Sequence, residues 1–173
     1  MISVAVIGGG ASGMAFAVAL KQKRPDIEVT VFEKNPKVLK KMLVTGNGRC
    51  NILNFDAVAE NYFEACEFVR PAVEKYAPKK TEAIFRDMGL LLMSEQEGRA
   101  YPISQTAASV VCVLSSAAER AGVKVFTDTP VKSIKKSQGG FVINNDKSFN
   151  FAVIACGGAA APKQGTDGSS FEL

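Results

Sequence analysis

Three glycines and one acidic residue near the start of the chain have the types and spacing of a nucleotide-binding site. Gly8, Gly10 and Gly13 form the pattern G-x-G-x-x-G, and Glu33 follows about 20 residues after the last of them. The first glycine allows a tight turn, the second lets a pyrophosphate approach the backbone, and the third lets a helix pack closely on a strand. The acidic side chain accepts hydrogen bonds from ribose hydroxyls. The pattern predicts a dinucleotide site, and a glycine turn without a ligand is the alternative.

A glycine fingerprint is informative only where it joins a strand to a helix. Residues 2–7 are apolar and rich in β-branched side chains, as in a buried strand. Residues 14–23 are rich in helix formers, and residues 27–33 alternate apolar and polar side chains like a second strand. This order predicts a βαβ unit with parallel strands. The N–H groups at the start of the helix, around Ala11 and Ser12, would then meet the phosphate charge.

The rest of the chain continues with helices and strands. Further helices are predicted over residues 58–77, 80–88 and 106–122, a two-stranded hairpin within 89–104, and strands over 123–128, 131–137, 141–145 and 149–156. Gly122 stands just past the last helix, where a left-handed residue commonly ends one. The predicted fold class is α/β: a Rossmann-like parallel sheet with a β-meander and a small α+β insertion.

The fingerprint by itself leaves NAD and FAD open, and two features favour FAD. The fingerprint lies at the very N-terminus, as in flavoproteins whose first strand carries the FAD site. The three strands over 123–128, 131–137 and 141–145 fit a meander that leads back into the parallel sheet near the flavin. Residues 1–52 and 105–173 are therefore expected to form an incomplete FAD-binding domain, and residues 53–104 an inserted segment of helices and a hairpin.

The loop 44–51, VTGNGRCN, holds six residues that could contact a cofactor: Gly46, Asn47, Gly48, Arg49, Cys50 and Asn51. The two asparagines either cap the loop or donate hydrogen bonds to the flavin. Arg49 has two interpretations. It could bind the cofactor, at a phosphate or at the polar edge of the flavin, or it could tie the loop to a carboxylate of the protein. Cys50 is either a redox thiol or a small buried residue. Glycines on both sides of Asn47 would let the backbone pass close to a ligand.

Lysines cluster just before this loop, within residues 34–41. Lys34 and Lys41 could belong to a collar around a phosphate-bearing ligand. The alternative is a solvated loop, which is the ordinary role of such a run.

Composition limits the classes of function. The chain has 173 residues, is 47% hydrophobic and carries a net charge of +4, which is too small an excess to indicate nucleic-acid binding. It has no histidine, and its four cysteines have no CxxC spacing, so no metal site is expected. It has no apolar run long enough to span a bilayer and no secretory signal. The expected protein is cytoplasmic, with a small-molecule substrate, no nucleic-acid or membrane partner, and an open oligomeric state.

With these motifs placed, the chain resembles the bacterial NAD(P)/FAD-dependent oxidoreductases of the BaiN type, also called YhiN-like, within the glutathione-reductase-like FAD class. The matching stretches span almost the whole chain, and TGNGRCN is the most specific of them. They are GGGASGM (8–14), FEKNPK (32–37), KK (40–41), TGNGRCN (45–51), GRAYPIS (98–104), ACGGAAAP (155–162) and GTDG (165–168).

The resemblance implies FAD as cofactor, NAD(P)H as a possible electron donor, and hydride transfer through the flavin to an unsaturated or carbonyl small molecule. It adds Val131, Ala155, Gly157 and Gly158 as cofactor contacts. No side chain is a convincing acid or base, so no catalytic residue is assigned. The family's proteins are much longer, and this chain is expected to be their front part. The alternatives are a non-catalytic truncated dinucleotide-binding fragment and a flavoprotein that acts on RNA.

Three positions depart from the family pattern. Leu39 stands where glycine is usual before the basic pair, Cys156 where threonine is commoner, and Ser170 where glycine is usual. Leu39 bears most on the loop, because a glycine there permits a left-handed backbone. Cys156 is expected to be structural, since it ends a buried strand.

Overall fold

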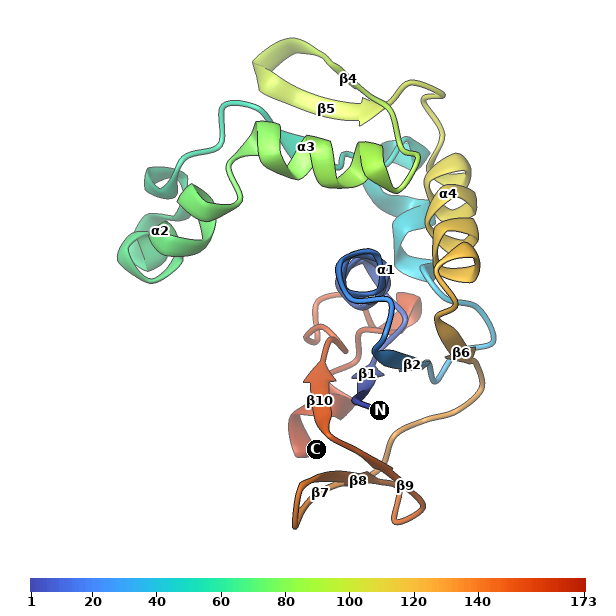
Figure 1. Ribbon diagram of the computed structural model, residues 1–173. Helices are drawn as coiled ribbons and strands as arrows, with labels where there is room; N and C mark the ends of the chain where they lie inside the picture. The colour runs from blue at the N-terminus through green and yellow to red at the C-terminus, as the bar shows by residue number, and fades with distance from the viewer. The chain divides into compact units, whose positions relative to one another are not determined.

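The computed structural model describes residues 1–173, with the exception of the side chain of Ala65. The chain forms two compact units, one of residues 1–42 with 114–173 and one of residues 43–113. The α-helices are α1 (Ala11–Lys23), α2 (Cys66–Lys75), α3 (Pro78–Asp87) and α4 (Ala107–Arg120), labelled in Figure 1. None of the described helices has both the length and the apolar character needed to cross a membrane.

The strands form three sheets. The first unit holds a parallel sheet of β1 (Ser3–Ile7), β2 (Glu28–Phe32), β6 (Lys124–Phe126) and β10 (Phe151–Ile154), and a meander of β7 (Ile134–Ser137), β8 (Gly140–Ile143) and β9 (Lys147–Phe149). The second unit holds an antiparallel sheet of β3 (Leu53–Asn54), β4 (Leu92–Ser94) and β5 (Arg99–Pro102). Short 3₁₀ segments lie at Lys40–Gly48, Ala59–Ala65, Gln96–Gly98, Pro162–Gln164 and Ser169–Glu172.

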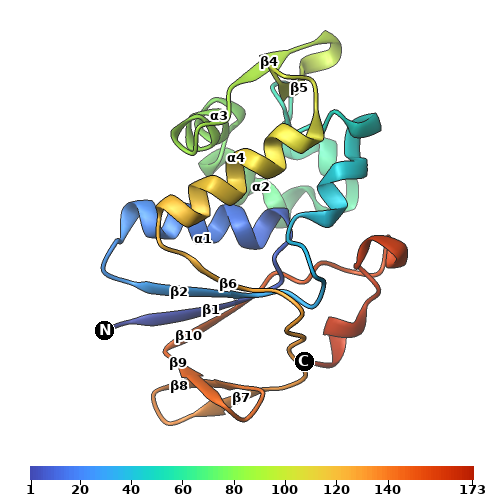
Figure 2. The ribbon, with the colours of Figure 1, turned by 90° about the vertical axis from the view of Figure 1, so that its right-hand side faces the viewer.

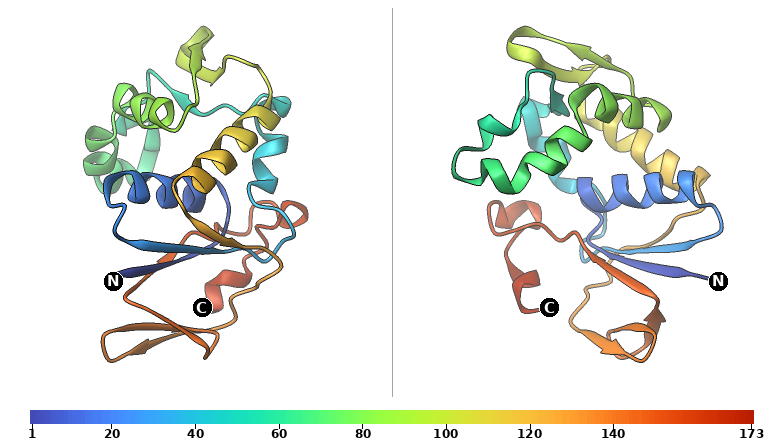
Figure 3. Two further views of the ribbon diagram at one scale, coloured as in Figure 1. Left: turned by 45° about the vertical axis from the view of Figure 1, so that its right-hand side comes forward. Right: turned by 60° about the vertical axis from the view of Figure 1, so that its left-hand side comes forward.

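The first unit is built in three layers. Its parallel sheet has the order β10-β1-β2-β6, with every neighbouring pair parallel. Helix α1 covers one face of this sheet and the meander β7–β9 covers the other, as Figures 2 and 3 show from several sides. The α/β class, the Rossmann-like parallel sheet and the meander predicted from the sequence are confirmed.

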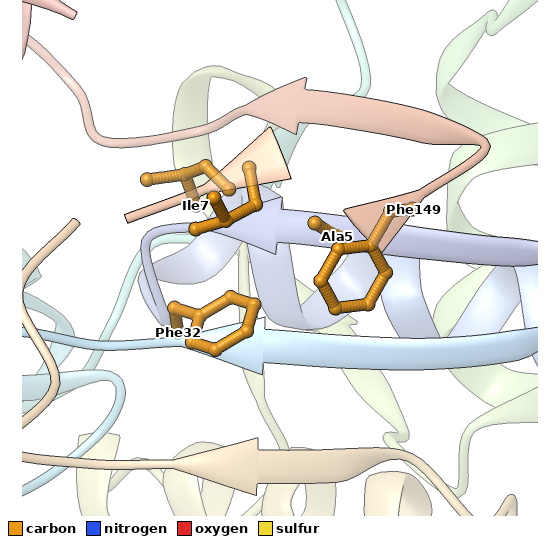
Figure 4. Packing of buried hydrophobic residues seen from close by; sticks show 5 residues of the cluster. Ala5, Ile7, Phe32 and Phe149 are labelled. Atoms are coloured by element: carbon orange, nitrogen blue, oxygen red, sulfur yellow. The ribbon is translucent and has the colours of Figure 1, made fainter. Parts of the chain in front are cut away.

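The side chains of β1 alternate between these two faces. Val4 and Val6 are buried toward one face, and Val6 Cγ1 lies beside Gly13 of α1. Ala5 and Ile7 point to the other face, where they form a cluster with Phe32, Ile143 and Phe149 (Figure 4). Phe149 of β9 meets Phe32 of β2 edge to face, with ring centroids 5.8 Å apart. Apolar contact thus fixes the meander on the sheet, in agreement with a strand that is buried on both sides.

Two strand assignments from the sequence are wrong in detail. Residues 124–126 join the parallel sheet next to β2, so the third strand of the meander is β9. The single strand predicted over 149–156 is divided at Asn150, whose side chain accepts a hydrogen bond from the Ser3 N–H at 2.8 Å. On one side of Asn150 the chain pairs antiparallel with β8, and on the other it pairs parallel with β1. The single asparagine that interrupts this apolar run does not show which strands pair with the residues on its two sides.

The second unit contains the predicted hairpin. Strands β4 and β5 pair antiparallel around the 3₁₀ turn at Gln96–Gly98. The helix predicted over 58–77 is wrong in part, because a 3₁₀ segment at Ala59–Ala65 precedes α2. Phe63 has a φ of 38°, outside the helical region, so a continuous helix cannot pass through it.

Candidate dinucleotide-binding site

The glycine fingerprint lies where the strand order of the parallel sheet changes direction. From β1, the chain adds β2 and then β6 on one side, and β10 on the other side. In open parallel sheets, ligands bind beyond the carboxyl ends of the strands at such a switch point. The carboxyl ends of β1 and β10 lead directly into Gly8 and Ala155. The topology therefore brings the fingerprint and the ACGG stretch together.

Gly8 forms the tight turn that the fingerprint requires. Its φ is +107°, and its N–H donates to the carbonyl oxygen of Phe32 at 2.8 Å. A Cβ at this position would lie 2.6 Å from the carbonyl oxygen of Ala155, so only glycine fits the backbone angle and the space. Ala155 in turn donates its N–H to Ile7 at 2.8 Å. Gly157 and Gly158 continue the chain from this point of close approach.

The N-terminus of α1 is open toward the outside of the protein. Gly10 is the N-cap residue, and no side chain caps the helix there. A Cβ on Gly10 would meet no atom within 4 Å. Ala11 and Ser12 follow in an exposed first turn that has no acidic residue. The uncapped N–H groups and the positive end of the helix dipole make this a suitable place for an anion.

Gly13 holds the helix close to the first strand. A Cβ on Gly13 would overlap the carbonyl oxygen of Gly8 and would lie 3.2 Å from Val6 Cγ1. The three glycines therefore have three different environments: a strained turn, an open face and a close contact. These are the three functions that the fingerprint assigns to them.

Glu33 connects the glycine turn to the loop that follows β2. Its side chain is buried, with 7% of the residue exposed. Oε2 accepts the N–H of Gly9 at 2.8 Å, and Oε1 accepts the backbone N–H of Asn35 at 2.8 Å and its side-chain Nδ2 at 2.6 Å. A carboxylate has about four acceptor positions, so about one is left beyond these three bonds. The arrangement fits a ribose hydroxyl as the further donor.

Lys34 has protein partners near this edge of the sheet. Its Nζ donates to Asp167 Oδ1 at 2.7 Å and to Ser169 Oγ at 3.0 Å, which joins the loop after β2 to the GTDG stretch. The hydrogen bond from Lys34 holds the pKa of the Asp167 carboxyl below its usual range. Lys41 is exposed in the 3₁₀ segment Lys40–Gly48. A contact of either lysine with the cofactor stays a prediction.

Leu39 is a residue of this region whose role the sequence did not reveal. It is 1% exposed, has a φ of 60°, and donates its N–H to the carbonyl oxygen of Gly9 at 2.8 Å. The backbone is therefore left-handed at the position where the family resemblance implied glycine, and here a buried leucine adopts it. Together, Leu39 and Glu33 bind the C=O and the N–H of Gly9 and fix the glycine turn against the loop.

Val131 and Cys156 both pack against the meander side of the sheet. Each contacts the cluster of Ala5, Ile7, Phe32, Ile143 and Phe149 that Figure 4 shows. The expectation that Val131 opens a strand is wrong, because β7 begins at Ile134. Its contact with the adenine stays a prediction. Cys156 Sγ lies 3.2 Å from the carbonyl oxygen of Ile7, and burial raises the pKa of its thiol, which agrees with a structural role.

Arg49 is anchored within the second unit. Its Nη1 donates to both carboxylate oxygens of Glu95 at 2.9 and 3.0 Å and to Gln105 Oε1 at 2.9 Å. Its guanidinium lies over the ring of Tyr101, 4.0 Å from the centroid. These contacts favour the interpretation in which Arg49 ties the loop to a carboxylate. A direct contact of Arg49 with the cofactor stays a prediction.

The loop around Arg49 has an unusual backbone. Gly46, Asn47, Gly48 and Cys50 all have positive φ, between 52° and 80°. Cys50 is 2% exposed, and its N–H donates to the Thr45 carbonyl oxygen at 3.0 Å, as expected of a small buried residue. Asn47, Gly48 and Asn51 are exposed on the same loop. Contacts of these three residues with the cofactor stay predictions.

Replacing Arg49 by alanine separates its two interpretations. If the arginine ties the loop to β4 and β5, Arg49→Ala should lower the free energy of unfolding by about 1–2 kcal/mol, through loss of the ion pair and the aromatic contact. Affinity for FAD should then change little. Urea unfolding and flavin titration measure the two effects.

Arg99→Ala, which breaks an exposed pair with Glu97, is the matched control and should change stability by less than about 0.5 kcal/mol. A large loss of FAD affinity at unchanged stability would instead indicate that Arg49 contacts the cofactor.

Comparison with known proteins agrees with this geometry. The sequence model of the family described as HI0933-like protein Rossmann domain matches residues 2–173. The chain is 37% identical over 177 residues to the 3-dehydro-bile acid delta(4,6)-reductase of Clostridium scindens, and 23% identical over 182 residues to the ribosomal RNA dihydrouridine synthase of Haemophilus influenzae. These alignments cover 100% and 97% of this chain but 43% of each relative.

Solved structures share the fold at low sequence identity. THI4 of Thermovibrio ammonificans superposes with a TM-score of 0.58 at 19% identity, over 90% of this chain and 57% of that chain. CtdE, solved in complex with FAD and a substrate, superposes with a TM-score of 0.50 at 16% identity, over 91% of this chain and 38% of that chain. Because the family match spans residues 2–173, the chain belongs to the HI0933-like Rossmann domain family.

Proposed function

We propose that this chain binds FAD at the carboxyl ends of β1, β2 and β10. The pyrophosphate would lie against the open N-terminus of α1, and the adenosine ribose would bind Glu33. The observation that carries this proposal is the open space at Gly10, next to a buried carboxylate that retains an acceptor position. Gly8, Ala155, Gly157 and Gly158 would let the backbone pass close to the same ligand.

The protein that contains this chain is proposed to be an NAD(P)H-linked reductase of an unsaturated or carbonyl small molecule. FAD would supply the hydride chemistry, and the residues of this chain would bind and orient it. Support for the substrate class comes from the 37% identity to a bile acid reductase, which the chain matches over 43% of that protein's length. The alternative is a non-catalytic dinucleotide-binding fragment. It is supported by the same observation, that the chain matches 43% of that relative's length.

A second candidate function is the modification of RNA. One relative, at 23% identity, is a ribosomal RNA dihydrouridine synthase. The net charge of +4 gives only a weak electrostatic attraction to RNA. Binding of structured RNA at physiological salt, measured by filter retention, would support this candidate over a small-molecule reductase.

The visible spectrum of the purified chain tests the proposed cofactor. We expect a yellow protein with flavin absorption bands, either as isolated or after addition of FAD and removal of the excess. A protein that stays colourless after this treatment would contradict FAD binding by this chain. Bleaching of the bands by NADPH under anaerobic conditions would support an enzyme, whereas bound flavin that no nicotinamide nucleotide reduces would support a binding fragment.

A further inference from the structure

We propose that Asn35 is a positioning residue for FAD, acting through the carboxylate of Glu33. This inference rests on the proposed function, because it assumes that Glu33 binds the adenosine ribose. Asn35 approaches the carboxylate with two donors, its own backbone N–H and its side-chain amide, and both bind Oε1. The 2.6 Å bond from Nδ2 is the shorter of the two.

The two oxygens of Glu33 are held by two different segments of the chain. The Gly9 N–H of the glycine turn binds Oε2, and Asn35 binds Oε1. With one oxygen fixed by the turn and the other by the loop, the carboxyl plane cannot rotate about its terminal torsion, which is otherwise soft. The remaining acceptor position then has a defined direction. Asn35 would contribute to FAD affinity by maintaining this direction before the cofactor binds.

Neighbouring segments hold Asn35 itself in place. Its carbonyl oxygen accepts the N–H of Asp128 at 3.1 Å, just after β6. Its side chain packs against Gly165, where an added Cβ would lie 2.7 Å from Nδ2. Asn35 is thus enclosed by the exit of β6 and by the GTDG stretch, and its amide has little freedom to leave Glu33. The charged groups around it are Glu33, Lys34, Asp128 and Asp167.

Two substitutions at this position have different expected effects. Asn35→Ala removes the side-chain donor and keeps the backbone N–H, and we expect it to weaken FAD binding by about tenfold. Asn35→Asp places a second carboxyl beside Glu33, and we expect a loss of about a hundredfold at pH 8, where the introduced aspartate is ionised. Protonation of the introduced carboxyl at lower pH restores a hydrogen-bond donor to Glu33 Oε1 and removes the added negative charge, so FAD affinity of this variant should recover as the pH falls toward about 5.5.

Asn150→Ala is the matched control. Asn150 also binds neighbouring backbone through its side chain, but at Ser3, the amino end of the same sheet. It should lower thermal stability and leave FAD affinity within about twofold. Fluorescence titration with FAD at several pH values, combined with thermal melts, measures all four proteins.

The outcomes separate this inference from the proposed function. Weaker binding by Asn35→Ala together with a pH-dependent recovery of Asn35→Asp supports the positioning role. If the wild-type chain binds FAD and Asn35→Ala binds it equally well, the positioning role is wrong and the proposed function stands. If Asn35→Asp has a loss that does not vary with pH, the residue is structural and the inference is also wrong. Wild-type protein that fails to bind FAD overturns both.

Discussion

Gly10→Val is expected to weaken FAD binding by at least about a hundredfold while it shifts the melting temperature by less than about 3 °C. Gly10 has φ −78° and ψ −172°, an extended conformation that valine readily adopts. A Cβ there meets no protein atom within 4 Å, so the side chain would begin in open space. The added methyl groups would instead occupy the open space at the N-terminus of α1, where the pyrophosphate is proposed to lie. Flavin titration and a thermal melt measure the two effects.

Gly10→Ala is the graded control for this prediction. It adds one carbon at the same place, and its effect on FAD affinity should lie between those of wild type and Gly10→Val. Equal FAD affinity in all three proteins would show that the pyrophosphate does not pass over Gly10. A large fall in the melting temperature of Gly10→Val would show that the site is less open than the structure indicates.

Gly13→Ala, unlike Gly10→Val, is expected to cause a large loss of stability. The added Cβ would overlap the carbonyl oxygen of Gly8. That oxygen belongs to a turn fixed by hydrogen bonds from Gly8 to Phe32 and from Leu39 to Gly9, so it cannot move away cheaply. Helix α1 would have to shift from the sheet, and we expect the free energy of unfolding to fall by about 3 kcal/mol or more. Urea unfolding followed by circular dichroism measures the loss.

Gly122→Ala provides the reference for a glycine replaced without a steric overlap. Gly122 follows α4 with a φ of +73°, as predicted from the sequence, and a Cβ there meets nothing within 4 Å. Its replacement should cost about 1 kcal/mol through the left-handed backbone alone. If Gly13→Ala costs no more than this control, then α1 does not pack on the glycine turn as closely as the structure shows.

The sequence predicted those parts of the fold whose signals are local. The βαβ unit, the fingerprint turn and the β4–β5 hairpin each follow from residues within some tens of positions, and the structure confirms them. The strand order was not predictable in the same way. Which strand lies beside β2, and where the meander ends, depends on pairings between distant segments, and the apolar run around Asn150 gives no sign of them.

The candidate site likewise contains residues that a local motif predicts and residues whose roles depend on distant contacts. Gly8, Gly13 and Glu33 lie together as the fingerprint predicts, because their spacing encodes one turn. Leu39 and Asn35 were missed as site residues. Their roles come from contacts with Gly9 and Glu33, which no short sequence motif predicts. The acidic partner of Arg49 could not be named in advance, because Glu95 lies 46 residues away in sequence.

Because β1 pairs with β10, the first strand must remain without this partner until β10 has been synthesised. Ser3 and Asn150, which hold the amino ends of these strands together, are 147 residues apart in the chain. A ribosome that adds about 5–20 residues per second needs on the order of ten seconds to bridge that interval. During this time the first strand, although it becomes an inner strand of the sheet, has one edge of backbone N–H and C=O groups without its partner strand. We therefore expect nascent chains that carry this segment to need chaperones until β10 has emerged.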